Sequence, residues 1–118
     1  MIEIASHESE DFRVVTEYGD CRIGMIRHSD RFSRFAELEK HNQTDEAFVL
    51  LSGAATLYTD KETIPMEQNL VYNVPVGVWH HIVVSEGAVV LVVENKNTTV
   101  ENSEKRYLNT SEEKYAYK

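Results

Sequence analysis

The sequence contains a single cysteine, Cys21, among 118 residues. No disulfide can therefore form within the chain, and a lone thiol is typical of proteins from reducing compartments. No apolar run approaches the length of a membrane span, and the acidic first ten residues lack the apolar stretch of a targeting segment. We therefore expect a cytoplasmic protein with no membrane partner. No residue near Cys21 would activate the thiol, so we expect this side chain to pack rather than react.

Positive charge is also scarce, with 12 Lys and Arg against 20 Asp and Glu and a net charge of −8. Such a chain repels a phosphate backbone, so we expect no nucleic-acid partner. Between His41 and Asn95 the only basic residue is Lys61. The first third of the chain is richer in basic residues, which an anionic ligand could use, although we favour a solvated face. These residues are Arg13, Arg22, Arg27, Arg31, Arg34 and Lys40.

Hydrophobic residues make up 42% of the sequence, which is enough for the core of one domain of this length. They occur in short β-branched runs that are separated by Gly, Pro and polar turns, a pattern typical of an all-β sandwich or barrel. An N-terminal hairpin is expected to turn at Gly19-Asp20. The expected strands cover residues 12–18, 21–27, 47–51, 54–58, 63–66, 70–74, 79–84 and 88–93.

Two segments fit this strand pattern less well. Residues 29–38 place Phe32, Phe35 and Leu38 at helical spacing, but in an all-β chain we favour a loop that leads into a strand. Residues 96–118 are polar and lack strand alternation over most of their length. We therefore expect one domain over residues 1–118, with a barrel at about 12–95 and a C-terminal appendage at about 96–118 that Tyr107 and Leu108 anchor.

Two motifs contain most of the residues with chemical potential. In the first, His41 is followed by Glu46 after four residues and by Gly53 after six more; the second reads Pro-x-Gly-x-x-His and ends at His80. In order and spacing these segments resemble the two motifs of the cupin family. The resemblance implies a double-stranded β-helix, or jelly-roll, barrel with its functional site inside.

The chain departs from the family pattern at four positions. Ser33 and Asn69 stand where the motifs have glycine, Glu39 replaces the first histidine of His-x-His, and Val84 replaces the final asparagine. The change at Asn69 is mild, because asparagine tolerates a positive φ better than most residues.

Strand periodicity supports the same site. Side chains two residues apart on a strand share a face, so Glu39 should point the same way as His41, and Glu46 the same way as Phe48. Imidazole nitrogens and carboxylate oxygens are ligands for divalent first-row metals. We therefore predict a metal site of His41, Glu46 and His80, with Glu39 as the fourth group. Fe, Mn, Ni and Zn all suit these ligands.

Other polar residues are weaker candidates. Gln43 falls in a turn, and neutral amides bind such metals poorly. His81 should point to the face opposite His80 and is not expected to be a ligand. His7 and His28 have no partner pattern, so we expect both at the surface.

Two functions remain open. The resemblance implies a metal-dependent dioxygenase, isomerase or lyase that acts on a small organic acid or sugar-like molecule. The alternative is a non-enzymatic cupin that binds or senses a small molecule without a functional metal, a reading that the loss of the first motif histidine favours. In either case we expect a homodimer, as the resemblance to small cupins implies and as the exposed edges of an open sandwich favour.

Overall fold

The computed structural model describes residues 1–117, and its regular structure consists of antiparallel strands and two short 3-10 helices. Within these residues no helical segment has the length and hydrophobicity of a transmembrane span. The elements are β1 (Asp11–Tyr18), β2 (Cys21–Arg27), β3 (Glu37–His41), β4 (Glu46–Ser52), β5 (Ala55–Thr59), β6 (Thr63–Pro65), β7 (Val71–Val74), β8 (His80–Val84), β9 (Val89–Asn95), the 3-10 helix η1 (Val100–Asn102), β10 (Ser103–Tyr107) and the 3-10 helix η2 (Thr110–Glu112).

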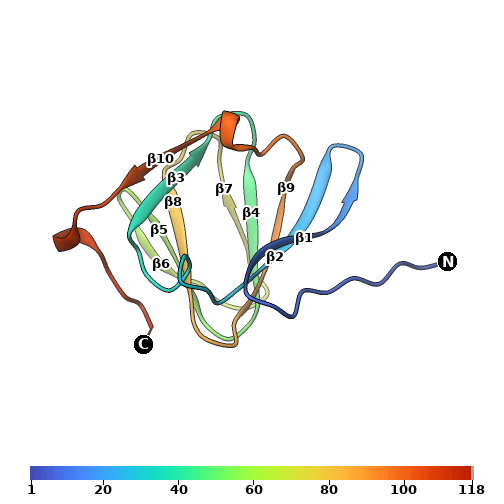
Figure 1. Cartoon of the computed structure of the whole chain (residues 1–118), viewed down its shortest axis with the longest axis horizontal. Coiled ribbons are helices and arrows are strands. Elements are labelled where there is room, and N and C mark those ends of the chain that lie inside the picture. Colours follow the sequence, from blue (N-terminus) through green and yellow to red (C-terminus); the bar gives the residue numbers. More distant parts are fainter. Residues whose placement is uncertain (118) are drawn as a thin grey trace.

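The strands form two sheets that face each other and enclose the interior (Figure 1). The first sheet has the order β1-β2-β9-β4-β7, and the second has the order β10-β3-β8-β5-β6. Apart from the β1–β2 and β5–β6 hairpins, strands that follow each other in the sequence, such as β3 and β4, lie in opposite sheets. This is the arrangement of a jelly roll. The expected all-β barrel is confirmed.

The N-terminal hairpin also forms as predicted. β1 and β2 are joined by Gly19 and Asp20, and Gly19 adopts a φ of 57° that this tight turn requires. Further along β2, Gly24 has the Phe12 ring lying where a β-carbon would be. The absence of a side chain at Gly24 therefore lets Phe12 lie over the inner face of the sheet.

The main core lies between the two sheets and is built by alternate residues of each strand. On β9, Val90 and Val92 are fully buried, whereas the intervening residues are only partly buried. Gly53 begins the β4–β5 connection at a φ of 77°, and a β-carbon there would lie 2.6 Å from Cα of Ala88. Only glycine permits both this conformation and this close approach.

A second cluster, made of Phe35, Leu38, Tyr58 and Val83, lies on the outer face of the second sheet. The loop over residues 29–36 supplies Phe35, as expected for a loop that leads into a strand. The C-terminal segment covers this cluster and contributes Leu108, Ala116 and Tyr117 to it.

The C-terminal segment differs from the expectation in one respect. β10 pairs with β3 over five residues and forms an edge of the second sheet, although no strand was expected after residue 95. The reason is that β10 is half-buried only at Ser103 and exposed at its other four residues, so its sequence shows no alternation. The segment is thus attached to the barrel by backbone pairing as well as by side chains.

Two smaller expectations were wrong. His7 is buried, because the N-terminal arm passes over the sheet there and the His7 Nε2–H donates to the backbone oxygen of Asp11 (2.8 Å). Cys21 is exposed at the start of β2 and does not pack in the core.

Candidate functional site

The three predicted ligand residues stand at the ends of strands that meet at one end of the barrel. His41 is the last residue of β3, Glu46 is the first of β4, and His80 is the first of β8. Glu46 lies on the first sheet and the two histidines lie on the second. The facing sheets therefore bring together Glu46 and His80, which are 34 positions apart in the sequence.

The loops next to these three residues are joined to each other by hydrogen bonds. The backbone N–H of Gly77 donates to the carbonyl oxygen of His41 (2.9 Å). Asp45 accepts hydrogen bonds from the Val76 backbone (2.9 Å) and from the Asn73 side chain (3.1 Å). These two bonds hold the pKa of the Asp45 carboxyl below its ordinary value. Asp45 was not singled out from the sequence, where it is one acid among several in a turn.

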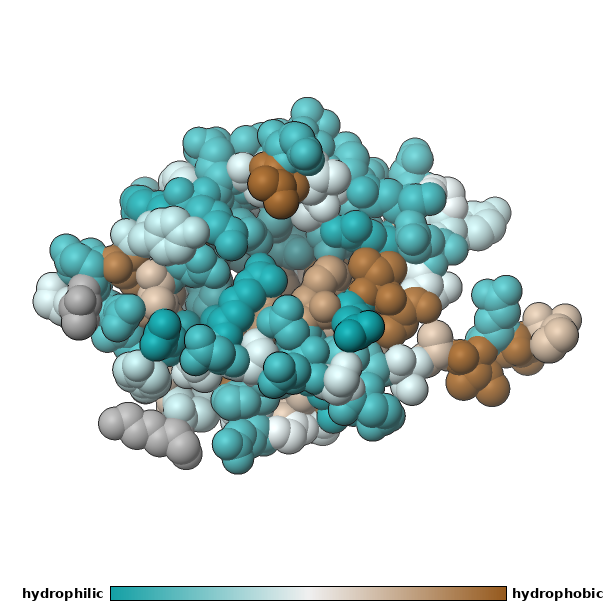
Figure 2. All heavy atoms as spheres, in the orientation of Figure 1, coloured by the Kyte–Doolittle hydropathy of each residue, from teal (hydrophilic) through white to brown (hydrophobic). Residues whose placement is uncertain are grey.

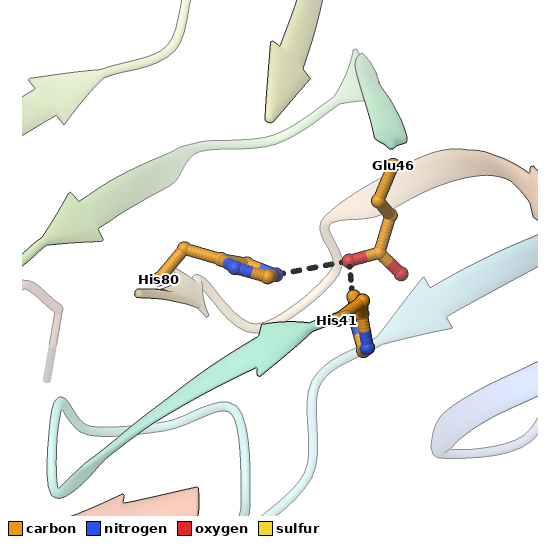
Figure 3. A group of neighbouring side chains, drawn as sticks. All are labelled: His41, Glu46 and His80. Carbon is orange, nitrogen blue, oxygen red and sulfur yellow. Dashed lines mark hydrogen bonds and ion pairs between the residues drawn. The ribbon is translucent and has the colours of Figure 1, made fainter. Parts of the chain in front are cut away.

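The side chains of His41, Glu46 and His80 converge on a single point (Figure 3). Oε1 of Glu46 lies 3.2 Å from Nε2 of His41 and 2.9 Å from Nε2 of His80. The three ligand atoms lie within 4.8 Å of one another, and all three residues are buried. The predicted convergence of these residues is thus a feature of the structure.

The outer nitrogen of each imidazole is also engaged. Nδ1 of His80 lies 3.0 Å from the carbonyl oxygen of Val78, to which only an N–H can donate. Nδ1 of His41 lies 2.8 Å from the Ser103 hydroxyl. Hydrogen bonds of this kind fix the orientation of an imidazole and leave its Nε2 directed at the centre of the site.

Electrostatics link the three groups. Burial alone would raise the pKa of Glu46, but the hydrogen bonds and charges of His41 and His80 outweigh it and lower the pKa to about 2. Burial would likewise lower the pKa of His41, but the hydrogen bond and charge of Glu46, aided by the charge of Glu39, raise it. The Glu46 carboxylate is therefore ionised and requires positive charge beside it.

Glu39 lies beside this group rather than within it. Its Oε1 is 3.5 Å from Nε2 of His41 and 3.8 Å from Nη2 of Arg31. Glu39 thus faces the site from the same strand face as His41, as expected, but Arg31 shares its charge.

Two more charged residues lie at the site: Glu94, which was missed from the sequence, and Arg22, which was expected on a solvated face. Glu94 on β9 pairs in register with both Glu46 on β4 and Arg22 on β2. Its side chain is 2% exposed, and its Oε1 lies 3.5 Å from Nε of Arg22. Burial, followed by the charge of Glu46, raises the pKa of Glu94 despite the opposing effects of the Thr98 side-chain hydrogen bond and the charge of Arg22. The alternation Val90-Val92-Glu94 was the signal that could have placed Glu94 inside.

These residues line one cavity of about 530 Å³ that opens between β3 and β10 on one side and β1 and β2 on the other. The surface is hollowed at this place (Figure 2). We call the end of the cavity at His41, Glu46 and His80 the upper end. Apolar side chains form the walls below it: Phe12, Ile26, Phe32, Phe48, Ile82 and Val92. Charged groups gather at the upper end and the rim, where Arg31 and Lys105 each pair with Glu37 at 3.9 and 3.7 Å.

The weaker candidates lie outside the cluster, as expected. The Nε2–H of His81 donates to the carbonyl oxygen of Arg31 (3.2 Å), and the ring stacks near Phe32 and Phe35. Burial, together with the charge of Arg31, lowers the pKa of His81 to about 4. Gln43 is exposed in the β3–β4 loop and accepts a hydrogen bond from Asn97 (3.4 Å).

Comparison with known proteins agrees with this architecture. Residues 33–94, more than half of the chain, match the family described as the cupin domain. The chain belongs to the cupin family. The matched range includes His41, Glu46 and His80, and it ends at Glu94. No curated protein matches this cupin sequence.

Several solved structures share the fold. A cupin-2 domain protein from Shewanella frigidimarina is 21% identical with a TM-score of 0.64, and the match covers 77% of this chain and 85% of that one. Pac13 from Streptomyces, described as a nucleoside dehydratase, is 14% identical with a TM-score of 0.69 over 94% and 92% of the two chains. KdgF from Halomonas is 16% identical with a TM-score of 0.60 over 71% and 76%. At these identities the likeness shows the fold alone.

Proposed function

We propose that this cupin binds one divalent cation through His41, Glu46 and His80, with Glu39 as the fourth group, and that it is an enzyme for a small organic acid or sugar-like molecule. The observation that carries the proposal is the convergence of three buried ligand atoms within 4.8 Å. The reaction class, whether dioxygenase, isomerase or lyase, rests on the family resemblance.

The residues present fit a divalent metal. Two imidazole nitrogens and a carboxylate oxygen suit Fe, Mn, Ni or Zn, and three protein ligands leave room for a substrate oxygen. A bound ion of this kind supplies Lewis-acid or oxygen-activating chemistry. It would also compensate the buried Glu46 carboxylate, which now depends on the two histidines.

The chain itself contributes position and environment. Val78 and Ser103 hold the imidazoles of His80 and His41 in place through their Nδ1 atoms. The apolar walls below, which include Phe48 and Ile82, exclude water from the lower part of the cavity. A substrate would therefore enter at the charged rim and have its polar groups at the upper end.

A second candidate function is a cupin that binds a small molecule without metal. One observation favours it, because His41 and His80 already compensate Glu46 in the structure described above. The two candidates differ in metal affinity, which is directly measurable.

The test is a metal titration of the purified protein by calorimetry, with Mn, Fe, Ni and Zn. Removing one of three ligands should lower metal affinity at least tenfold, so we expect this loss in H80A. The matched control is H28A, which alters a histidine outside the site and should leave affinity unchanged. Equal affinity in the wild type and H80A would reject the metal site and leave the metal-free function.

We also propose that the protein forms a homodimer. The N-terminal arm leaves the body of the molecule (Figure 1), and its Ile2 and Ile4 side chains are 86% and 93% exposed. The edge strand β7 exposes Val71 as well, at 70%. Contact with a second copy would cover such surfaces. Sedimentation should show a dimer at micromolar concentrations, and a monomer there would refute the proposal.

The proposed cellular location is the cytoplasm. Cys21 is exposed, and an exposed thiol without a partner in its own chain is best preserved in a reducing compartment. Fractionation of the source cells, followed by thiol labelling of Cys21, would test this.

A further inference from the structure

The inner face of β3 is polar along its whole length. Glu37, Glu39 and His41 all line the cavity, and Lys105 on β10 lies directly opposite Glu39. The Glu37 and Glu39 side chains are only 15% and 21% exposed. Acidic side chains that lie inside a barrel in this way are costly unless they have positively charged partners. This wall of the cavity therefore has a charged strip that runs from His41 to the rim.

Arg31 reaches the same strip from the loop over residues 29–36. Its backbone carbonyl oxygen accepts the Nε2–H of His81 (3.2 Å), and its guanidinium carbon lies 4.6 Å from the centre of the Phe32 ring. Phe32 is buried in the core, so its ring gives the guanidinium a fixed support. The Arg31 side chain lines the cavity and is 41% exposed, which leaves it accessible to a ligand.

The positively charged atoms at the rim have unused hydrogen-bonding capacity. Nε and Nη2 of Arg31 lie 3.9 Å from Glu37 and 3.8 Å from Glu39, and Nζ of Lys105 lies 3.7 Å from Glu37. These distances exceed the range of a hydrogen bond, and within residues 1–117 neither side chain donates one. Partly exposed ion pairs of this kind contribute little free energy, so a ligand with good acceptor atoms can replace them.

The deeper acids of the cavity leave little uncompensated negative charge. Glu46 lies between two histidines, and Glu94 is paired with Arg22. A cation bound beside Glu46 would add to its compensation. The charge that an entering ligand meets is therefore set by the rim, where two basic side chains face two acidic ones.

Glu39 connects this rim to the group of His41, Glu46 and His80. A single oxygen, Oε1 of Glu39, lies 3.5 Å from Nε2 of His41 and 3.8 Å from Nη2 of Arg31. If Glu39 serves as the fourth group for the cation, its negative charge is drawn toward the cation and away from Arg31. The rim then has an excess of positive charge, and Arg31 no longer has the partner that a ligand would have to displace.

We propose that Arg31, assisted by Lys105, forms a carboxylate-binding subsite, so that the ligand of this cavity is a small organic acid rather than a neutral sugar. The guanidinium fork donates two parallel hydrogen bonds to the carboxylate. Because one oxygen of Glu39 spans the gap between Arg31 and His41, a short acid such as a 2-hydroxy acid can reach Arg31 and the cation together. The subsite deepens the proposed function by choosing between its substrate classes, and its dependence on the cation rests on that function.

The test compares the affinity of the full-length protein for acids and for their neutral amides, with L-lactate against L-lactamide and glycolate against glycolamide. Calorimetric titration would be carried out with and without Mn, because Mn alone binds carboxylates. The variants are R31Q, which removes the charge, and R31K, which keeps the charge and loses the fork. R13Q is the control, because Arg13 is exposed on β1 and does not line the cavity.

The wild type with Mn should bind the acid more tightly than the amide. Loss of a charge-assisted bidentate pair should weaken acid binding about tenfold in R31Q and leave amide binding within about twofold of the wild type. R31K should fall between R31Q and the wild type, and R13Q should match the wild type. Without Mn, E39Q should bind the acid more tightly than the wild type does, because the side chain that competes for Arg31 has lost its charge.

Acid affinity of R31Q within about twofold of the wild type would overturn the subsite. So would equal losses of acid and amide binding, which would mean that Arg31 only holds the loop, or an absence of acid binding at millimolar concentrations with and without Mn. E39Q binding the acid no more tightly than the wild type without Mn would overturn the competition between Glu39 and the ligand.

Metal titration of the same samples tests the proposed function separately, and R31Q should retain the metal affinity that H80A loses. A wild type that binds no metal would reject the cation. The comparison of R31Q with the wild type in metal-free buffer would still decide the subsite.

Discussion

The backbone N–H of Gly77 donates a 2.9 Å hydrogen bond to the carbonyl oxygen of His41. Gly77 belongs to the turn that precedes His80, so this bond joins the two motifs directly. Gly77 adopts a φ of 80°, a conformation that glycine reaches without strain. The relative position of the two histidines therefore depends on backbone contacts between loops as well as on the sheet that carries them.

Asp45 reinforces this junction, and we expect D45A to loosen the site. The change removes the acceptor for Val76 N–H and for the Asn73 amide, which hold the Pro75–Gly77 turn against the β3–β4 loop. Loss of such an outer contact should lower metal affinity about tenfold. Calorimetric titration of Mn or Zn would measure it, and D60A, an acid in an exposed turn elsewhere, is the matched control. Unchanged affinity in D45A would show that the turn holds its shape without Asp45.

Metal binding should also stabilise the fold. A ligand that binds only the folded state at about 100 times its dissociation constant raises the free energy of unfolding by about 2.7 kcal/mol. We expect a rise of this order in the wild type and little rise in H80A, because His80 supplies one of the three ligand atoms. Urea unfolding with and without added metal would measure the difference. A chelator should reverse the effect, and equal shifts in both proteins would place the metal elsewhere.

Much of this fold was predictable from the sequence, and the reasons are physical. Strands such as β9 bury every second residue, so their alternation is visible without a structure. Asn69 adopts a φ of 68°, the conformation expected where the family motif has glycine. The convergence of His41, Glu46 and His80 followed from family spacing combined with this periodicity.

The missed residues share one property, which is that their environment depends on a distant segment. Glu94 is enclosed because β2 and β4 flank β9, a pairing that no local pattern reveals. β10 is mostly exposed, and only its pairing with β3 makes it a strand. His7 is buried by the fold-back of an arm that carries no strand of its own. The environment of a side chain was therefore predictable where its neighbours lie on the same strand or in the two family motifs.

His81 should make stability sensitive to mild acid. Its pKa is about 4 in the folded protein against 6.5 in the unfolded chain, so between these values the unfolded state binds more protons. The free energy of unfolding should therefore have its full value above pH 6.5 and fall as the pH drops toward 4. The whole His81 contribution amounts to about 3 kcal/mol.

The variant H81Q tests this dependence, because glutamine keeps an N–H for the Arg31 carbonyl oxygen and does not titrate. Urea unfolding of both proteins from neutral to mildly acid pH would give two stability curves. We expect the wild type to lose more stability than H81Q over this range. Curves that stay parallel would mean that His81 titrates equally in the folded and unfolded states.

The C-terminal segment should stabilise the barrel, although its polar composition led us to expect an appendage outside the barrel. Phe35 and Lys114 exchange two backbone hydrogen bonds, of 2.6 and 3.1 Å, and the Tyr117 hydroxyl lies 2.8 Å from that of the buried Thr56. Deleting residues 111–118 would break these bonds and uncover the outer cluster, so the free energy of unfolding should fall by about 2 to 4 kcal/mol.

Two point variants separate the contributions. Y117F should lose only the hydroxyl contact, and its free energy of unfolding should fall by about 1 kcal/mol. Y107F is the control on the exposed edge of β10 and should stay within about 0.5 kcal/mol of the wild type. Urea unfolding of the three variants would measure these differences, and a truncated protein as stable as the wild type would mean that the segment adds nothing to the outer face of the second sheet.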